Sequence, residues 1–186
     1  METPTLVCTR DWGIPGANYY YVNHERKNIT LEELAEVGVV DDRTYVHPDL
    51  IKPLVEVLAA LAAYGYGILI VDAYRSAATY ALVRRKYAEQ NSEESASRLF
   101  NMEVMPHTNG RTIDVDLIDL ATGKKIMTRD NAKDGLDASF EGFYRDRDDP
   151  DSREFQRLQD LLHRIMFAAG FILGSKREVW HFELPE

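Results

Sequence analysis

The feature that most constrains this 186-residue sequence is the alternation of apolar and polar residues from Thr112 to Asp119. An isoleucine, a valine and a leucine fall on one side of a strand with a period of two, and Asp114 and Asp116 fall on the other. Such a strand needs a hydrophobic core on one side only. We therefore expect a sheet whose reverse face is apolar and whose free face carries acidic side chains.

The other elements mix helices with short strands, which favours an α+β fold over a repeating βαβ arrangement. Thr30 to Glu33 matches a capping box, and Ser76 is a second N-cap candidate. We expect one domain over 1–186 with an irregular segment at 1–30, in which a mainly antiparallel central sheet is flanked by helices. Its predicted helices are Pro48–Tyr64, Ala77–Glu89 and Ser152–Ala169, and its strand-like pieces are Tyr19–Val22, Gly67–Val71, Phe171–Leu173 and Val179–Leu184. Residues 91–105 are ambiguous, and 130–151 is predicted to be a long surface loop.

Charge and cysteine content exclude several classes of protein. The chain has 22 Lys and Arg against 31 Asp and Glu, a net charge of -9, which argues against nucleic acid or an anionic membrane as a partner. No apolar run approaches the ~20 residues that span a bilayer. The start of the sequence lacks the pattern of a secretory signal, so we expect a cytoplasmic protein. A single cysteine, Cys8, excludes an intramolecular disulfide.

Two fragments hold unusual groups of titratable residues. His107 precedes Gly110 and Asp114, and Glu178 precedes His181 at the start of the last predicted strand. Each fragment alone is compatible with an ordinary hydrogen-bonded core histidine. Together they favour a site, because neighbouring strands would project Asp114 and His181 from the same side of the sheet.

Two imidazoles and one carboxylate are a ligand set that catalytic zinc uses, with a fourth position left for water. Regular strand geometry would send Glu178 and His181 to opposite faces, because they are three residues apart. We therefore predict that Glu178 occupies a bend before Val179. From there its carboxylate would take a proton from water and later deliver it to a leaving amine.

The pattern His-x-x-Gly-x-x-x-Asp followed by Glu-x-Trp-His resembles the zinc D-alanyl-D-alanine peptidases, which are similar in fold to lysostaphin-type enzymes and the hedgehog domain. The stretch from Gly65 to Arg75 is similar to a motif of the VanX-type dipeptidases. The resemblance implies one Zn²⁺ per chain, held by His107, Asp114 and His181. It also implies a small peptide substrate, Glu178 as the general base, and Arg75 as the cation beside the scissile carbonyl.

Arg75 also makes sense without the resemblance. It follows a buried strand, and a fixed guanidinium stabilises the negative charge that develops on a carbonyl oxygen under attack. The alternative is a surface arginine paired with Asp72. Asp116 and Glu183 share the polar face and are candidates for orienting the ligand imidazoles, although solvated edge charges fit them equally well. His24, His47 and His163 are expected to take no part.

Several positions depart from the family pattern. Met105 stands where a serine is usual, Arg111-Thr112 replaces a small pair, and Ser76 replaces a common proline. The loop between Arg75 and His107 also looks short for the dipeptidases. None of these changes touches the metal set, but they leave the choice of substrate open.

The resulting hypothesis is zinc-dependent hydrolysis of D-alanyl-D-alanine or a similar D-amino-acid dipeptide. The alternative within the class is a D,D- or L,D-carboxypeptidase acting on peptidoglycan peptides. Outside the class, the alternatives are a zinc-stabilised binding domain without turnover and a metal-free acidic module.

Overall fold

A computed structural model describes residues 4–100 and 102–186. Residues 1–3 of the segment predicted to be irregular, and residue 101 of the ambiguous segment, lie outside the described residues. The described residues form seven α-helices and six strands, which confirms the expected α+β class. In chain order they are β1 (Val7–Cys8), α1 (Tyr19–Val22), α2 (Leu31–Glu36), β2 (Tyr45–Val46), α3 (Ile51–Ala62), β3 (Tyr66–Asp72), α4 (Ala77–Gln90), α5 (Glu93–Leu99), β4 (Thr112–Asp119), α6 (Asn131–Asp134), α7 (Pro150–Ala168), β5 (Ile172–Leu173) and β6 (His181–Glu183).

Strands β3, β4, β6 and β5 lie side by side in that order, and β1 and β2 form a separate antiparallel pair. The pairing of β5 with β6 is antiparallel, as expected, with Leu173 opposite Phe182. Strand β4 has the predicted bounds, and its apolar side chains Ile113, Val115 and Leu117 are all buried. The alternation in the sequence therefore gives the strand its two faces, as predicted.

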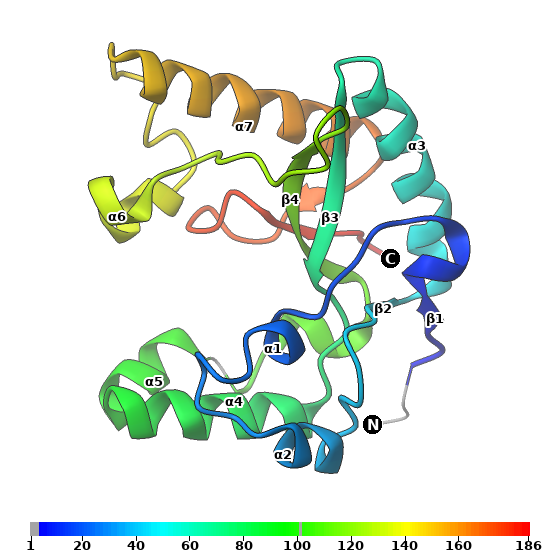
Figure 1. The fold of residues 1–186 in the computed structure, drawn as a ribbon, viewed down its shortest axis with the longest axis vertical. Coiled ribbons are helices and arrows are strands. Elements are labelled where there is room, and N and C mark those ends of the chain that lie inside the picture. Colours follow the sequence, from blue (N-terminus) through cyan, green and yellow to red (C-terminus); the bar gives the residue numbers. More distant parts are fainter. Residues whose placement is uncertain (1–3, 101) are drawn as a thin grey trace. The chain divides into compact units, whose positions relative to one another are not determined.

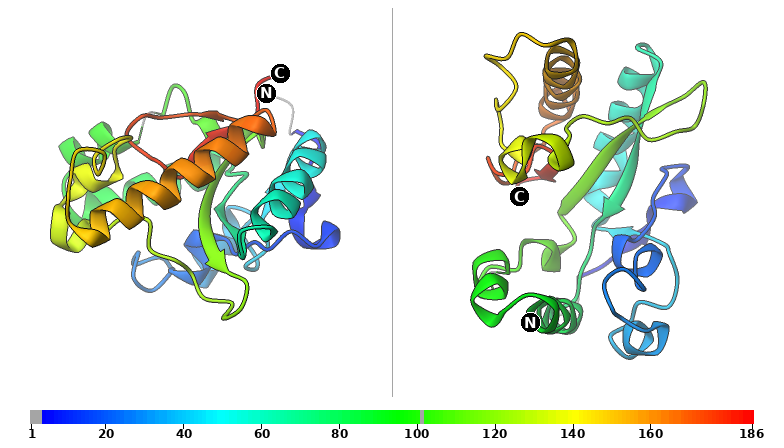
Figure 2. Two further views of the ribbon diagram at one scale, coloured as in Figure 1. Left: turned by 90° about the horizontal axis from the view of Figure 1, so that it is seen from above. Right: turned by 60° about the vertical axis from the view of Figure 1, so that its left-hand side comes forward.

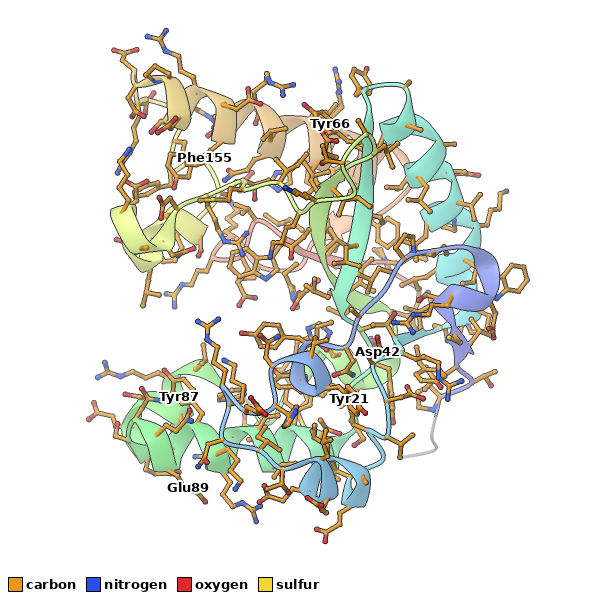
Figure 3. The ribbon with its side chains drawn as sticks, viewed as in Figure 1. Tyr21, Asp42, Tyr66, Tyr87, Glu89 and Phe155 are labelled. Atoms are coloured by element: carbon orange, nitrogen blue, oxygen red, sulfur yellow. The ribbon has the colours of Figure 1, made fainter. Side chains whose placement is uncertain are left out.

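Close packing of the chain defines two compact units, Met1–Pro48 with Ile70–Ile113, and Asp49–Leu69 with Asp114–Glu186. In the described part of the first unit, α1, α2 and α4 meet around a buried cluster made of Tyr20, Ile29, Leu34, Leu82 and Val83. Figure 1 shows α4 and α5 side by side. Tyr87 of α4 packs edge-to-face against Phe100, with ring centroids 5.6 Å apart (Figure 3). This cluster is thus formed mainly by residues of the helices.

In the second unit, α3 packs against α7. Tyr66 at the start of β3 accepts a 3.0 Å hydrogen bond from Arg157 on α7 (Figure 3). Segment 130–151 folds along α7: Phe155 of α7 contacts the buried Tyr144 at 5.1 Å between ring centroids. Figure 2 shows α6, which belongs to this segment, near the N-terminal end of α7. The prediction of a plain surface loop at 130–151 is therefore wrong, because the segment contains short helices and buries an aromatic ring.

Several predicted helix ends are confirmed. The Thr30 side chain accepts the Glu33 backbone N–H, the Glu33 carboxylate accepts the Thr30 N–H, and Ser76 caps α4. Gly65 and Gly170 have φ of +80° and +93°, the left-handed conformation that ends a helix and that glycine adopts easily. The capping residues of these helices can therefore be predicted from residues close to them in the sequence.

Other predictions are wrong at the level of single elements. Tyr19–Val22 is helix α1 and not a strand, because Asn18 caps it by accepting the N–H groups of Tyr20 and Tyr21. Helix α7 begins at Pro150, because Asp149 and not Ser152 supplies the cap. Part of the ambiguous segment is helix α5, capped by Ser92. Among the described residues, no helix combines the length and apolar character needed to cross a membrane.

Candidate metal centre

The three residues predicted to bind metal come together. His107, Asp114 and His181 each offer one ligand atom, and these atoms all lie within 4.8 Å of one another. Both histidines are buried, and Asp114 is partly buried. The two sequence fragments therefore meet as predicted. A different local feature of the structure positions each candidate ligand.

His107 lies in the 3₁₀ turn Pro106–Asn109 that precedes β4. Its Nδ1 is 2.9 Å from the carbonyl oxygen of Ala73, and a carbonyl only accepts, so Nδ1 carries the proton and Nε2 keeps its lone pair. Its backbone N–H donates to the Tyr80 hydroxyl at 3.2 Å. These contacts fix both the tautomer and the direction of the ring.

Gly110 ends this turn with a φ of +72°. An added Cβ there would lie 2.7 Å from Leu6 Cδ2 and 3.1 Å from the backbone nitrogen of His47, and that nitrogen donates to the Gly110 carbonyl at 2.8 Å. The position thus requires glycine for both conformation and space. This explains the glycine between His107 and Asp114 in the motif.

Asp114 projects from β4, and its Oδ1 lies 2.8 Å from His181 Nδ1. His181 opens β6, whose backbone is held on both sides. Val115 donates to the Trp180 carbonyl at 3.0 Å, and Gly174 donates to the His181 carbonyl at 2.9 Å. The Nδ1 edge of His181 faces the Asp114 carboxylate, and the sheet fixes the backbone from which the ring projects.

The opposite edge of His181 rests against Gly174. A Cβ on Gly174 would lie 2.6 Å from His181 Cδ2 and 2.9 Å from Nε2. Gly174→Ala is therefore expected to push the ring out of place and to weaken zinc binding by roughly 10- to 100-fold, as loss of a supporting contact typically does. The zinc dissociation constant, measured by competition with a chromophoric chelator, tests this.

Ser175→Ala is the control, because it changes the neighbouring residue without adding an atom toward His181. Equal zinc affinity of Gly174→Ala and the unmodified protein would show that the ring is not held as described.

Glu178 occupies the predicted bend. The His181 N–H donates to the Glu178 carbonyl at 3.1 Å, which closes a tight turn before β6. Strand β6 therefore begins at His181 and not at Val179, two residues later than predicted. The turn brings Glu178 Oε2 to 3.7 Å from His181 Nδ1, with the side chain 40% exposed. Its carboxylate thus lies beside the ligand set and is still open to solvent.

Arg75 follows β3 and is buried, forming a close ion pair with Asp72. The pairing with Asp72 was the alternative expectation, but the side chain is not on the surface. Its guanidinium carbon lies 4.3 Å from the Tyr80 ring centroid and 4.9 Å from that of Tyr20. Burial acts most strongly against the charge, yet Asp72 and the two tyrosines outweigh it and raise the pKa of Arg75. The guanidinium is held rigidly in its charged form.

The Arg75 backbone N–H also donates to the His107 carbonyl at 3.2 Å. Tyr80 stacks on the Arg75 guanidinium and accepts from the His107 N–H. One tyrosine therefore joins the predicted carbonyl-binding cation to a predicted metal ligand. Sequence spacing gave no signal for Tyr80, since it lies inside a helix 27 residues before His107.

The remaining candidates have defined places. Asp116 is buried and its Oδ2 lies 2.5 Å from Lys125 Nζ, and Glu183 pairs with Ile172 in the sheet. Their role in orienting imidazoles stays a prediction. His163 is buried and donates from Nε2 to the Val179 carbonyl at 2.8 Å. This buried hydrogen bond is compatible with the expectation that His163 takes no part in the site.

The donor set fits zinc. It offers two imidazoles and a carboxylate, the combination found at catalytic zinc sites. His107 has its tautomer fixed for ligation through Nε2, and Gly174 leaves the space that the His181 ring occupies. A further carboxylate, that of Glu178, lies close to this set without belonging to it.

Comparison with known proteins adds to this picture. The profile of one protein family, described as D-Ala-D-Ala dipeptidase (M15 peptidases), matches residues 20–186. Among solved structures, the chain is similar to the LD-carboxypeptidase LdcB, with 16% identity, a TM-score of 0.49, and coverage of 75% of this chain and 59% of that one. It is also similar to a zinc complex of the vancomycin resistance D,D-pentapeptidase VanY, with 13% identity, a TM-score of 0.45, and coverage of 76% and 73%. No curated protein matches.

Proposed function

The chain belongs to the D-Ala-D-Ala dipeptidase family of zinc metallopeptidases, M15, and we propose that it hydrolyses D-alanyl-D-alanine or a similar small D-amino-acid dipeptide. The observation that carries the proposal is the convergence of three ligand atoms, from His107, Asp114 and His181, within 4.8 Å. Zinc, when bound by these residues, supplies a Lewis acid that makes water acidic near neutral pH and polarises a carbonyl.

Glu178 is proposed as the general base. Its carboxylate is outside the ligand set, close to it and exposed, so it can accept a proton from the attacking water. The water oxygen then bonds to the carbonyl carbon. When the peptide C–N bond breaks, the same carboxyl group returns the proton to the departing amine nitrogen. One water is consumed, and an acid and an amine are released.

Arg75 is proposed as the cation that stabilises the developing oxyanion. Three observations support this role. The guanidinium is permanently charged, its side chain is buried, and Asp72 and two tyrosines hold it in place. A donor that is fixed before the reaction costs no reorganisation when negative charge appears on the oxygen. A mobile surface arginine would lack this advantage.

A substrate panel tests the proposal. We expect freshly purified protein to contain close to one zinc per chain and to release D-alanine from D-alanyl-D-alanine, but not L-alanine from L-alanyl-L-alanine. Alanine release only from a longer muropeptide would instead identify a carboxypeptidase of peptidoglycan peptides. Bound zinc without hydrolysis of any substrate would indicate a binding domain without turnover.

A further inference from the structure

A second arginine lies beside the candidate metal centre and has no role in the proposed mechanism. The guanidinium carbon of Arg129 lies 3.6 Å from the ring centroid of Trp180, the residue before the ligand His181. This is a close cation–π stack, in which one face of the guanidinium is covered by the indole. The stack covers the face of the guanidinium, while the N–H groups point outward from its edges.

Both partners of the stack are fixed by buried contacts. The carbonyl of Thr128, just before Arg129, accepts a 2.7 Å hydrogen bond from the side chain of the buried Gln159. Just after it, the N–H of Asp130 donates to the hydroxyl of the buried Tyr144 at 2.9 Å. Trp180 is held to β4 through Val115. The backbone before and after Arg129 and the backbone of Trp180 are therefore held in place by hydrogen bonds.

Two of the three carboxylates whose charges act on Arg129 are paired with other groups. Asp116 pairs with Lys125 at 2.5 Å, and Asp114 lies 2.8 Å from His181. In the part of the chain that the structure describes, Arg129 forms no ion pair, and its one side-chain hydrogen bond is a long 3.5 Å contact to Thr128. Burial lowers the pKa of Arg129, while the charges of Asp116, Asp114 and Glu178 oppose that shift. A half-buried cation with unused donors thus sits within the electrostatic reach of the ligand Asp114 and the base Glu178.

We propose that Arg129 binds the free α-carboxylate of the peptide substrate and so determines that the enzyme acts on a C-terminal peptide bond. The inference rests on the proposed function. A planar guanidinium with its face covered presents its N–H groups edge-on, the geometry that holds a carboxylate through two parallel hydrogen bonds. The substrate anion would supply the partner that no protein carboxylate provides, and anchoring it would fix the adjacent peptide bond beside Glu178.

Substrate pairs that differ only at this carboxylate test the assignment. For D-alanyl-D-alanine and its C-terminal amide, the unmodified enzyme is expected to show a kcat/KM about 10²-fold higher for the free acid. Arg129→Met should reduce kcat/KM for the acid by about 10²-fold and for the amide only slightly, so that the two converge. Arg129→Lys keeps the positive charge but loses the planar group that forms two parallel hydrogen bonds. It should retain part of the preference for the free acid over the amide.

Arg164→Met is the matched control. Arg164 also stacks on an aromatic ring, that of Tyr64 at 5.7 Å, but lies on the exposed surface of α7. It should leave the acid-to-amide ratio unchanged. An equal loss for acid and amide in both Arg129 variants would overturn the proposal, because it would show that the arginine only supports Trp180.

Binding without turnover separates this inference from the proposed function. In a Trp12→Phe background, Trp180 is the only tryptophan, so its fluorescence reports on the stack directly. N-acetyl-D-alanine is expected to give a saturable change that its amide does not give and that Arg129→Met abolishes. Such binding in a protein that hydrolyses no dipeptide would uphold the carboxylate site and refute the proposed function. Hydrolysis without this discrimination would refute the carboxylate site alone.

Discussion

Glu178→Gln is expected to lower kcat for D-alanyl-D-alanine by about 10³-fold, within the range that general acid–base catalysis contributes. The amide has nearly the same shape as the carboxylate but cannot take a proton from water. Glu178 is 40% exposed and outside the three-residue ligand set, so neither folding nor zinc content should change. Steady-state kinetics and elemental analysis of the same preparation measure the two quantities together.

Glu141→Gln is the matched control, since Glu141 is an exposed glutamate of the 130–151 segment with no proposed part in the reaction. It should leave kcat unchanged. Hydrolysis by Glu178→Gln at the normal rate would contradict the assignment of the base. Loss of zinc from the variant would show instead that Glu178 acts as a metal ligand.

The sequence predicted best those features that depend on neighbours in the chain. Strand β4 was located to the residue, because a period of two over eight residues is a strong signal and its apolar side is buried. The capping box at Thr30 and the cap at Ser76 were also correct, since capping is decided within three residues. The three candidate ligands could be picked out for the same reason, since they lie in two short motifs.

The wrong predictions concern elements whose structure depends on distant contacts, or on which of two residues caps a helix. Tyr19–Val22 consists of residues that favour strands, yet Asn18 caps it as a helix and Tyr20 is buried among residues of α2 and α4. At α7, both Asp149 and Ser152 are good caps, and Pro150 at the first helical position was the signal that favours Asp149.

The supports of the centre were not predictable in the same way. Tyr80 contacts His107 across 27 residues, and no motif in the sequence links the two. Gly174 matters because its missing Cβ leaves space for a ring on the next strand. Spacing identified which residues have ligand chemistry, but only the pairing of strands and helices reveals what orients them.

His107→Ala is expected to weaken zinc binding by roughly 10²-fold and to abolish measurable hydrolysis at limiting zinc. The free energy of zinc binding at tetrahedral protein sites, about 10–16 kcal/mol, corresponds to about 3 kcal/mol for each ligand. The variant also leaves the Ala73 carbonyl without its His107 partner, whereas alanine keeps the backbone N–H that donates to the Tyr80 hydroxyl. Chelator competition measures the affinity.

Thermal unfolding gives an independent measurement, because a ligand that binds only the folded state stabilises it by RT ln(1 + [L]/Kd), where [L] is the free ligand concentration. Added zinc should raise the Tm of the unmodified protein clearly more than that of His107→Ala. His24→Ala is the control: its ring contacts the Ile29 carbonyl at 3.2 Å and is not in the ligand set, so the zinc-dependent rise should persist. If zinc stabilised His107→Ala as strongly as the unmodified protein, the ion would have to be held elsewhere, and the geometry of His107, Asp114 and His181 would need another explanation.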